Sequence, residues 1–192
     1  MTIKEQLYAY TVDVCQRIVT SDFDVLTAIV HRLAQVKTDG KTVYTAGNGG
    51  SAATASHICN DLVKGCRVDD REGFKAFCLV DSNAIVSCLA NDFSYEDIFT
   101  IQLKTYAEKG DVLITFSGSG HSPNIISVLK TAREMGIFTI GFSGRDGGQM
   151  KAWCDLLLIA PTVSMEQIED MHLLYTHAMI DSLKTLLQEN NV

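Results

Sequence analysis

Two residues with chemically useful side chains, His57 and Asp61, stand four positions apart in a segment whose sequence predicts a helix from Ser51 to Lys64. Residues at positions i and i+4 lie on one helical face, so the imidazole and the carboxylate are expected to be neighbours. Such a pair can transfer protons or supply two ligands to a metal ion. A solvated aspartate beside a structural histidine would show the same spacing, so the flanking segments must decide between these interpretations.

The segment that precedes this helix is a glycine-rich turn, Gly47-Asn48-Gly49-Gly50-Ser51. The turn follows a short run, Thr42–Thr45, that is typical of a buried strand. Glycines let a ligand approach the backbone closely, and the unpaired N–H groups of a first helical turn attract anions. The sequence therefore predicts a phosphate-binding cradle at the start of the helix that carries His57 and Asp61.

A second loop, Ser117-Gly118-Ser119-Gly120-His121-Ser122, follows another strand-like run and ends at Pro123. Serine followed by proline is a typical helix start, and the three hydroxyls beside a helix N-terminus favour an anion. Considered alone, a flexible turn with an ordinary cap explains the loop equally well. Two such loops at one edge of a sheet make phosphate binding the favoured interpretation.

A third loop, from Ser143 to Gly148, contains the one arginine of the three loops, Arg145. Asp146 stands beside it and can neutralise its charge. We therefore expect this loop to be a structural turn and not a phosphate-binding element.

Five short runs of β-branched, aliphatic and aromatic residues predict buried strands, at 42–45, 76–80, 112–116, 138–142 and 156–159. Helical segments alternate with them, at 51–64, 83–89 with 95–107, and 123–135. Two helices, at about 3–19 and 23–36, come first, and a long helix at about 166–188 comes last. This alternation predicts an α/β protein with a doubly wound, flavodoxin-like, five-stranded parallel sheet. Residues 1–192 are expected to form a single domain.

The overall composition argues against nucleic acids and membranes as partners. The 192 residues carry a formal net charge of −7 without a basic patch, which argues against nucleic acid as a partner. The six cysteines include no C-x-x-C pair and are expected to be reduced and structural. No apolar run approaches the ~20 residues of a membrane span, and the first residues contain no apolar signal segment. We therefore expect a cytoplasmic protein without a membrane partner.

Several motifs occur in the order known from one family: Gly47–Ser51, Asn91–Phe93, Gly110–Ile114, Ser117–Asn124 and Gly144–Met150. On these motifs the chain resembles the sugar isomerase (SIS) domain family over nearly its whole length. The helix of His57, together with Glu169 and His177, is similar to the phosphoheptose isomerase branch. The resemblance implies a homotetramer with active sites at subunit interfaces, and zinc in some members. It also implies interconversion of sedoheptulose 7-phosphate and D-glycero-D-manno-heptose 7-phosphate.

The resemblance also implies roles for individual residues. Asp61 would be the base that moves a proton between adjacent carbons, and His177 the acid that serves the oxygen, with an enediol between the two steps. Zinc would be held by His57, Asp61, Glu169 and His177. The residues expected to bind substrate are Asn48, Gly49, Gly50, Ser51, Asp92, Ser117, Gly118, Ser119, Ser122, Glu166 and Glu169.

Helical geometry adds two expectations about the last helix. His172 lies about 140° around the helix from His177, so both cannot face one site, and His172 is expected to be structural. Glu169 lies about 12 Å along the axis from His177, which is a long reach for two ligands of one ion. The family usually has glutamate in place of Asp61 and glutamine in place of Glu169. These two changes either compensate each other, or mark a different sugar phosphate or lost catalysis.

Three functions remain compatible with the sequence. The first is an isomerase of sedoheptulose 7-phosphate or of another sugar phosphate. The second is a non-catalytic SIS tetramer that binds a protein partner, as replication-initiator-associating relatives do; these relatives lack the second histidine of the last helix, so His177 favours the enzyme. The third is a sugar-phosphate-sensing regulator, but no DNA-binding segment accompanies the domain in this sequence.

Overall fold

The computed structural model describes residues 1–68 and 71–189 and contains a five-stranded, all-parallel sheet. The strands are β1 (Thr42–Gly47), β2 (Lys75–Cys78), β3 (Val112–Ser117), β4 (Phe138–Gly144) and β5 (Leu156–Ala160). Their order, β2-β1-β3-β4-β5, is the predicted flavodoxin-like topology, in which the direction of winding reverses between β1 and β3. Ligands of such sheets bind at the carboxyl ends of the strands on either side of this reversal.

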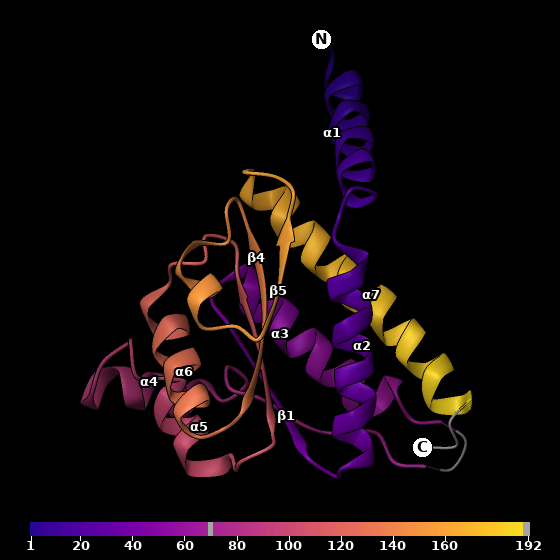
Figure 1. Ribbon diagram of the computed structural model, residues 1–192. Coiled ribbons are helices and arrows are strands. Elements are labelled where there is room, and N and C mark those ends of the chain that lie inside the picture. Colours follow the sequence, from indigo (N-terminus) through magenta and orange to yellow (C-terminus); the bar gives the residue numbers. More distant parts are fainter. Residues whose placement is uncertain (69–70, 190–192) are drawn as a thin grey trace.

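Helices cover both faces of the sheet (Figure 1). The α-helices of the structure are α1 (Ile3–Ile18), α2 (Phe23–Thr38), α3 (Gly50–Asn60), α4 (Asn83–Asp92), α5 (Thr100–Tyr106), α6 (Pro123–Glu134) and α7 (Met165–Glu189), of which all but α1 pack on the sheet. Helices α2, α3 and α7 lie on one face, and α4, α5 and α6 lie on the other (Figure 1). The two N-terminal helices and the long last helix are confirmed. Among the described residues, no helix is both long and apolar enough to cross a lipid bilayer.

The sheet supplies two apolar cores because successive side chains of a strand point in opposite directions. In β3, Ile114 and Phe116 pack in the core beneath α2, α3 and α7, whereas Leu113 packs beneath α5 and α6. All six residues of β3 are buried, which explains why four of them, Val112, Leu113, Ile114 and Phe116, are apolar. The sheet is therefore a rigid base for the loops at its carboxyl edge.

The six cysteines are all free thiols. Burial raises the pKa of Cys59 and Cys154 to about 12, so both stay protonated, as expected of structural residues. Cys15 and Cys88 are exposed, so the core role expected of the cysteines does not extend to these two.

The helix predicted from Ser51 to Lys64 is not α-helical throughout. It is an α-helix to Asn60 and then widens into a π-helical turn, Asp61–Gly65. The wider turn is closed by the N–H of Cys66, which donates to the carbonyl of Asp61 at 2.9 Å. Single π-turns within helices often occur at functional sites, and this one begins at the predicted base.

The helix predicted from Tyr95 to Ala107 begins later, at Thr100. Residues 95–99 form turns instead. The Ser94 hydroxyl donates to the Asp97 carboxylate at 2.8 Å, and the Asp97 N–H donates to the Ser94 carbonyl at 3.1 Å. Such local bonds compete with helix formation, and they explain why the prediction was wrong for these residues.

Candidate active site

The glycine-rich turn between β1 and α3 has a backbone that only glycine adopts easily. Gly49, the N-cap of α3, has a φ of 56°. A Cβ on Gly47 would lie 2.3 Å from the carbonyl oxygen of Ser51, so the end of β1 passes directly against the first turn of α3. This close approach brings the N-terminus of α3 to the carboxyl edge of the sheet, as predicted for an anion cradle.

The second loop leads into α6 with Ser122 as the N-cap and Pro123 at the first helical position, as predicted. The Ser122 hydroxyl makes no capping hydrogen bond. It lies 3.2 Å from the hydroxyl of Ser117, at the end of β3. Because the Ser122 hydroxyl is not used to cap the helix, it is free to donate to an anion at the N-terminus of α6.

The third loop supports the second one and is a structural turn, as expected. The Ser143 hydroxyl donates to the carbonyl of Ser117 at 2.9 Å, and the N–H of Gly144 donates to the carbonyl of Gly118 at 3.2 Å. Arg145 follows with a φ of 56°, inside a turn that the N–H of Gly147 closes by donating to the carbonyl of Gly144 at 2.9 Å. The end of β4 thus fixes the start of the second loop through these two hydrogen bonds.

The first two loops enclose a cavity of about 130 Å³. It is lined by Asn48, Ser51, Phe116, Ser117, Gly118, Ser119, Ser122, Met165 and Glu169. Apart from Phe116 and Met165, these residues were predicted to bind substrate. None of these lining residues is a lysine or arginine, so a phosphate here would be held by hydroxyls, amide N–H groups and the two helix N-termini.

Glu169 places a carboxylate in this cavity, against the start of α3. A Cβ on Gly50 would lie 2.2 Å from Glu169 Oε2, so the carboxylate rests on the Gly50 backbone. Only glycine leaves room for this contact. The carboxylate therefore occupies part of the cradle that is predicted to receive the substrate phosphate.

A second group of side chains forms further along α3 and α7. The Nε2 atoms of His57 and His177 lie 2.8 Å apart, and Asp61 Oδ2 lies 3.3 Å from the first and 3.9 Å from the second. One imidazole nitrogen must carry a hydrogen and the other accept it. The structure thus brings the predicted base and acid together with His57.

The donor atoms of this group fit a zinc ion. All three lie within 4.8 Å of one another. Two ligands about 2.0–2.1 Å from zinc at the tetrahedral angle lie about 3.3 Å apart, which falls within the observed range of 2.8–3.9 Å. Glu169, the fourth predicted ligand, is not part of the group. Three protein ligands with one open position are typical of catalytic zinc sites.

The cavity and the histidine–aspartate group are two helical turns apart. Gly50 precedes His57 by seven residues, about 10 Å, and Glu169 precedes His177 by eight, about 12 Å. Gly50 contacts Glu169, and His57 contacts His177, so α3 and α7 run side by side in the same direction. The candidate site is therefore elongated, with the serine-lined cavity at one end and the histidine–aspartate group at the other.

Two further acidic residues predicted to bind substrate do not line the cavity. Asp92 is exposed at the end of α4 and accepts a hydrogen bond from the Asn91 side chain at 2.8 Å. Glu166 is exposed in the first turn of α7, where its own backbone N–H and the Ser164 hydroxyl lower the pKa of its carboxyl. Contact of either residue with substrate hydroxyls stays a prediction.

His172 is structural, as the helical geometry predicted. It is 1% exposed, packs against the rings of Phe116 and Phe142, and its Nε2 lies 3.0 Å from the carbonyl oxygen of Ser143. Burial lowers the pKa of this imidazole to about 4, so the ring is neutral at neutral pH. A neutral ring that donates from Nε2 to the Ser143 carbonyl cannot also serve the active site.

Two residues that the sequence did not single out join the site. Asn124, at the second position of α6, is 1% exposed and exchanges two hydrogen bonds with Asn48. The hydroxyl of Tyr95 donates to Asn48 Oδ1 at 3.0 Å. These contacts join residues 76 and 47 positions apart, so no local pattern reveals them. The one available signal was that Asn124 closes the second loop motif.

Comparison with known proteins relates this chain to one family. Residues 6–144 match the family model of the SIS domain. A phosphoheptose isomerase from Clostridium acetobutylicum is 39% identical over 156 residues, which cover 81% of this chain and 79% of that protein. Another, from Paramagnetospirillum magneticum, is 40% identical over 159 residues, which cover 81% of this chain and 82% of that protein. The structure of a phosphoheptose isomerase from Neisseria gonorrhoeae matches with a TM-score of 0.88 at 27% identity, covering 96% of this chain and 100% of that one.

Proposed function

The chain belongs to the SIS domain family, among the phosphoheptose isomerases, and we propose that it interconverts sedoheptulose 7-phosphate and D-glycero-D-manno-heptose 7-phosphate. It is an aldose–ketose isomerase. One observation carries the choice of substrate: the serine-lined cavity and the histidine–aspartate group lie two helical turns apart on α3 and α7. A substrate must therefore present a phosphate far from its reacting carbons.

The length of a seven-carbon chain suits this separation. Seven bonds join the phosphorus to C2 in a 7-phosphate, and an extended chain advances about 1.2 Å per bond, giving about 8–9 Å. In a three-carbon ketose phosphate the same atoms are only about 4 Å apart. The ~10–12 Å between the two groups along the helices leaves room for the side chains to reach the longer substrate at both ends.

The reaction needs one base and one acid that serve adjacent atoms. The Asp61 carboxylate takes a proton from C1 of the ketose while His177 gives a proton to the carbonyl oxygen on C2, which produces the enediol. His177 then takes the proton of the C1 hydroxyl, and Asp61 returns its proton to C2. The product has an aldehyde at C1 and a hydroxyl at C2, and both residues regain their starting states.

The cavity would fix the other end of the substrate. Ser51, Ser117, Ser119 and Ser122 would donate hydrogen bonds to the phosphate, and Asn48 and the glycine backbones would complete the cradle. Asp92, Glu166 and Glu169 would contact sugar hydroxyls. Holding the phosphate keeps C1 and C2 at the proton-transfer groups, which turns the reaction into a unimolecular step.

His57, Asp61 and His177 would also hold a zinc ion. A bound zinc ion would act as a Lewis acid that polarises the substrate carbonyl. Asp61 has two carboxylate oxygens and His177 has two ring nitrogens, so each residue could hold a metal with one atom and exchange a proton through the other. The role of His57 is then to hold Asp61 and His177 in place, with or without the ion.

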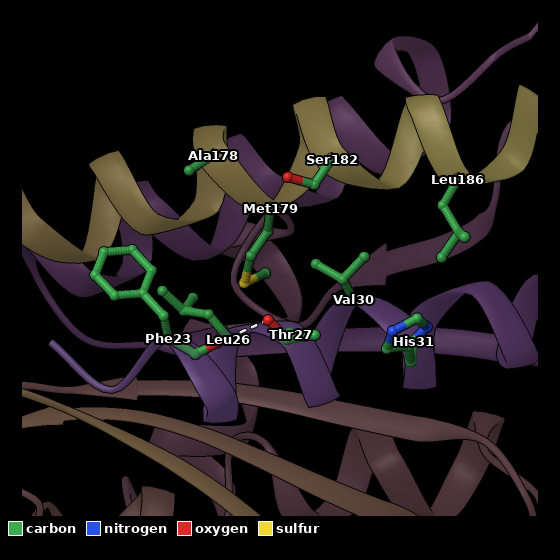
Figure 2. Close-up of a pocket in the computed structure, with 9 residues that line it drawn as sticks. All are labelled: Phe23, Leu26, Thr27, Val30, His31, Ala178, Met179, Ser182 and Leu186. Atoms are coloured by element: carbon green, nitrogen blue, oxygen red, sulfur yellow. Dashed lines mark hydrogen bonds between the residues drawn. The ribbon is translucent and has the colours of Figure 1, made fainter.

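We further propose a homotetramer, and two surfaces support assembly with further copies of this chain. Helix α1 projects from the body (Figure 1), and none of its residues is buried; Leu7 and Tyr8 are 67% and 72% exposed. A groove of about 360 Å³ lies between α2 and α7. Figure 2 shows the largely apolar side chains that line it, such as Phe23, Val30 and Leu186. Light scattering after size exclusion tests this assembly, and a monomer at micromolar concentration would contradict it.

The decisive test of the reaction is incubation of the purified protein with sedoheptulose 7-phosphate, with and without zinc. We expect the aldoheptose phosphate to form. Fructose 6-phosphate, which is one carbon shorter, serves as the competing substrate and should turn over more slowly. Turnover of the shorter ketose phosphate alone would identify an isomerase of another sugar phosphate. No turnover of either compound would favour the alternative, a non-catalytic SIS tetramer that binds a protein partner.

A further inference from the structure

An amide pair links the two loops of the phosphate cavity. Asn48 belongs to the first loop, and Asn124 lies at the start of α6, directly after the second loop. The Nδ2 of each residue lies 2.9 Å from the Oδ1 of the other. Because each amide gives one donor and one acceptor to the pair, both the separation and the orientation of the two side chains are fixed.

A third bond completes this arrangement. The hydroxyl of Tyr95, in the segment between α4 and α5, donates to Asn48 Oδ1 at 3.0 Å. Asn48 Oδ1 thus accepts two hydrogen bonds, and its Nδ2 uses one of its two hydrogens within the described residues. The second hydrogen is free for a ligand, and Asn48 lines the cavity.

Asn124 itself is not among the residues that line the cavity, and it is 1% exposed. It therefore has no direct route to a bound phosphate. Any effect of Asn124 on binding must pass through Asn48 and the position of the first loop relative to the second. A buried amide that loses its partner is left with unsatisfied groups, so the pair resists separation.

We propose that Asn124 is a positioning residue of this isomerase. Through its pair with Asn48 it holds the first loop against the second, so that Ser51 and the hydroxyls of Ser117, Ser119 and Ser122 converge on one phosphate. The inference rests on the proposed role of the cavity in binding the substrate phosphate. It does not depend on which sugar carries that phosphate.

The test measures binding of inorganic phosphate by calorimetric titration of the folded protein, so that it is independent of turnover. We expect Asn124→Ala to weaken phosphate binding about tenfold, the effect of losing one good hydrogen-bonded contact. Asn48→Ala should weaken it at least as much. The double variant should bind no more weakly than Asn48→Ala alone, because Asn124 acts only through Asn48.

Thr139→Val is the matched control. Thr139 is buried at the opposite end of the sheet, where its hydroxyl donates to the Asp155 carboxylate at 2.9 Å. Loss of the Thr139 hydroxyl should lower the melting temperature and leave the affinity for phosphate unchanged. Asn124→Ser, which leaves a smaller void, replaces the alanine variant if that protein does not fold.

Two outcomes would overturn the inference. If Asn124→Ala lowers the melting temperature but binds phosphate like the unmodified protein, Asn124 is only structural. If the effects of the two single variants add in the double variant, Asn124 does not act through Asn48. A protein that shows the expected phosphate affinities but does not isomerise sedoheptulose 7-phosphate would contradict the proposed substrate and leave the role of Asn124 standing.

Discussion

The Nε2 atoms of His57 and His177 lie 2.8 Å apart, although 120 residues separate the two histidines. The contact exists because α3 and α7 run side by side, and the same two helices meet again where Glu169 rests on Gly50. Asp61 completes the first contact, at 3.3 Å from His57 Nε2. One pair of helices therefore sets both the position of the histidine–aspartate group and its distance from the serine-lined cavity.

His177→Ala should lower kcat/KM for sedoheptulose 7-phosphate by about 10²–10⁴-fold, the usual contribution of a positioned acid. The imidazole is half-exposed, so the melting temperature should change little. Thr185→Ala, at an exposed position two turns further along α7, is the control and should keep full activity. Full activity of the His177 variant would remove this residue from the mechanism.

Asp61→Asn keeps the shape of the side chain and removes its basicity. We expect kcat to fall at least ~10²-fold, with a smaller change in phosphate affinity, because the amide cannot accept the C1 proton. Asp61→Glu restores a carboxylate and should be closer to the unmodified enzyme. Exchange of the C1 proton with deuterated water, followed by NMR, reports the base directly; exchange that persists in the asparagine variant would assign the base elsewhere.

Zinc should bind through the histidine–aspartate group and raise the melting temperature of the unmodified protein, since a ligand that binds the folded state stabilises it. His57→Ala removes one of three ligands and should weaken zinc binding by at least ~10-fold. His31→Ala, which removes an exposed histidine in the groove between α2 and α7, is the control. Equal stabilisation of both variants by zinc would show that the ion binds outside this group.

Much of the fold could be predicted because the strands are buried on both faces. In β3 all six residues are buried and four of them are apolar without strict alternation, a pattern that suits a parallel strand covered on both faces. The serine and glycine loops could be predicted for the same reason, since the ends of such strands define the ligand-binding edge. The positions of Ser51 and Ser122 at helix starts follow from local chemistry alone.

Other parts depend on long-range contacts that local patterns do not encode. The pairing of Asn48 with Asn124 requires the packed sheet, and so does the contact of Tyr95 with Asn48. Helical spacing made one shared ion a long reach for Glu169 and His177 without excluding it, and the structure places Glu169 at the serine-lined cavity, apart from the histidine–aspartate group. The π-turn that begins at Asp61 could not be predicted either, because the spacing of apolar residues does not distinguish a π-turn from a continued α-helix.

Glu169→Gln should bind inorganic phosphate more tightly than the unmodified protein. The Glu169 carboxylate lies in the cavity, where no lysine or arginine is among the lining residues, and two negative charges a few ångströms apart repel each other by more than ~1 kcal/mol. Removing the charge should therefore raise the affinity about tenfold at pH 8. Glu166→Gln, one turn earlier on α7 and outside the cavity lining, is the matched control. Weaker binding by the Glu169 variant would mean that this carboxylate assists phosphate binding, directly or through a cation.

His172 should make the protein less stable in mild acid. Its pKa falls from 6.5 to about 4 on burial, so between these values the unfolded chain binds a proton that the folded chain does not. Stability contributed by the neutral ring is thus fully present above pH 6.5 and is lost as the pH falls towards 4, by about 3 kcal/mol in total.

His172→Gln keeps a donor for the Ser143 carbonyl and does not titrate. Its free energy of unfolding, measured with urea from pH 7 to pH 4, should fall less steeply than that of the unmodified protein. Equal slopes for the two proteins would mean that the His172 ring takes up protons as readily in the folded chain as in the unfolded one.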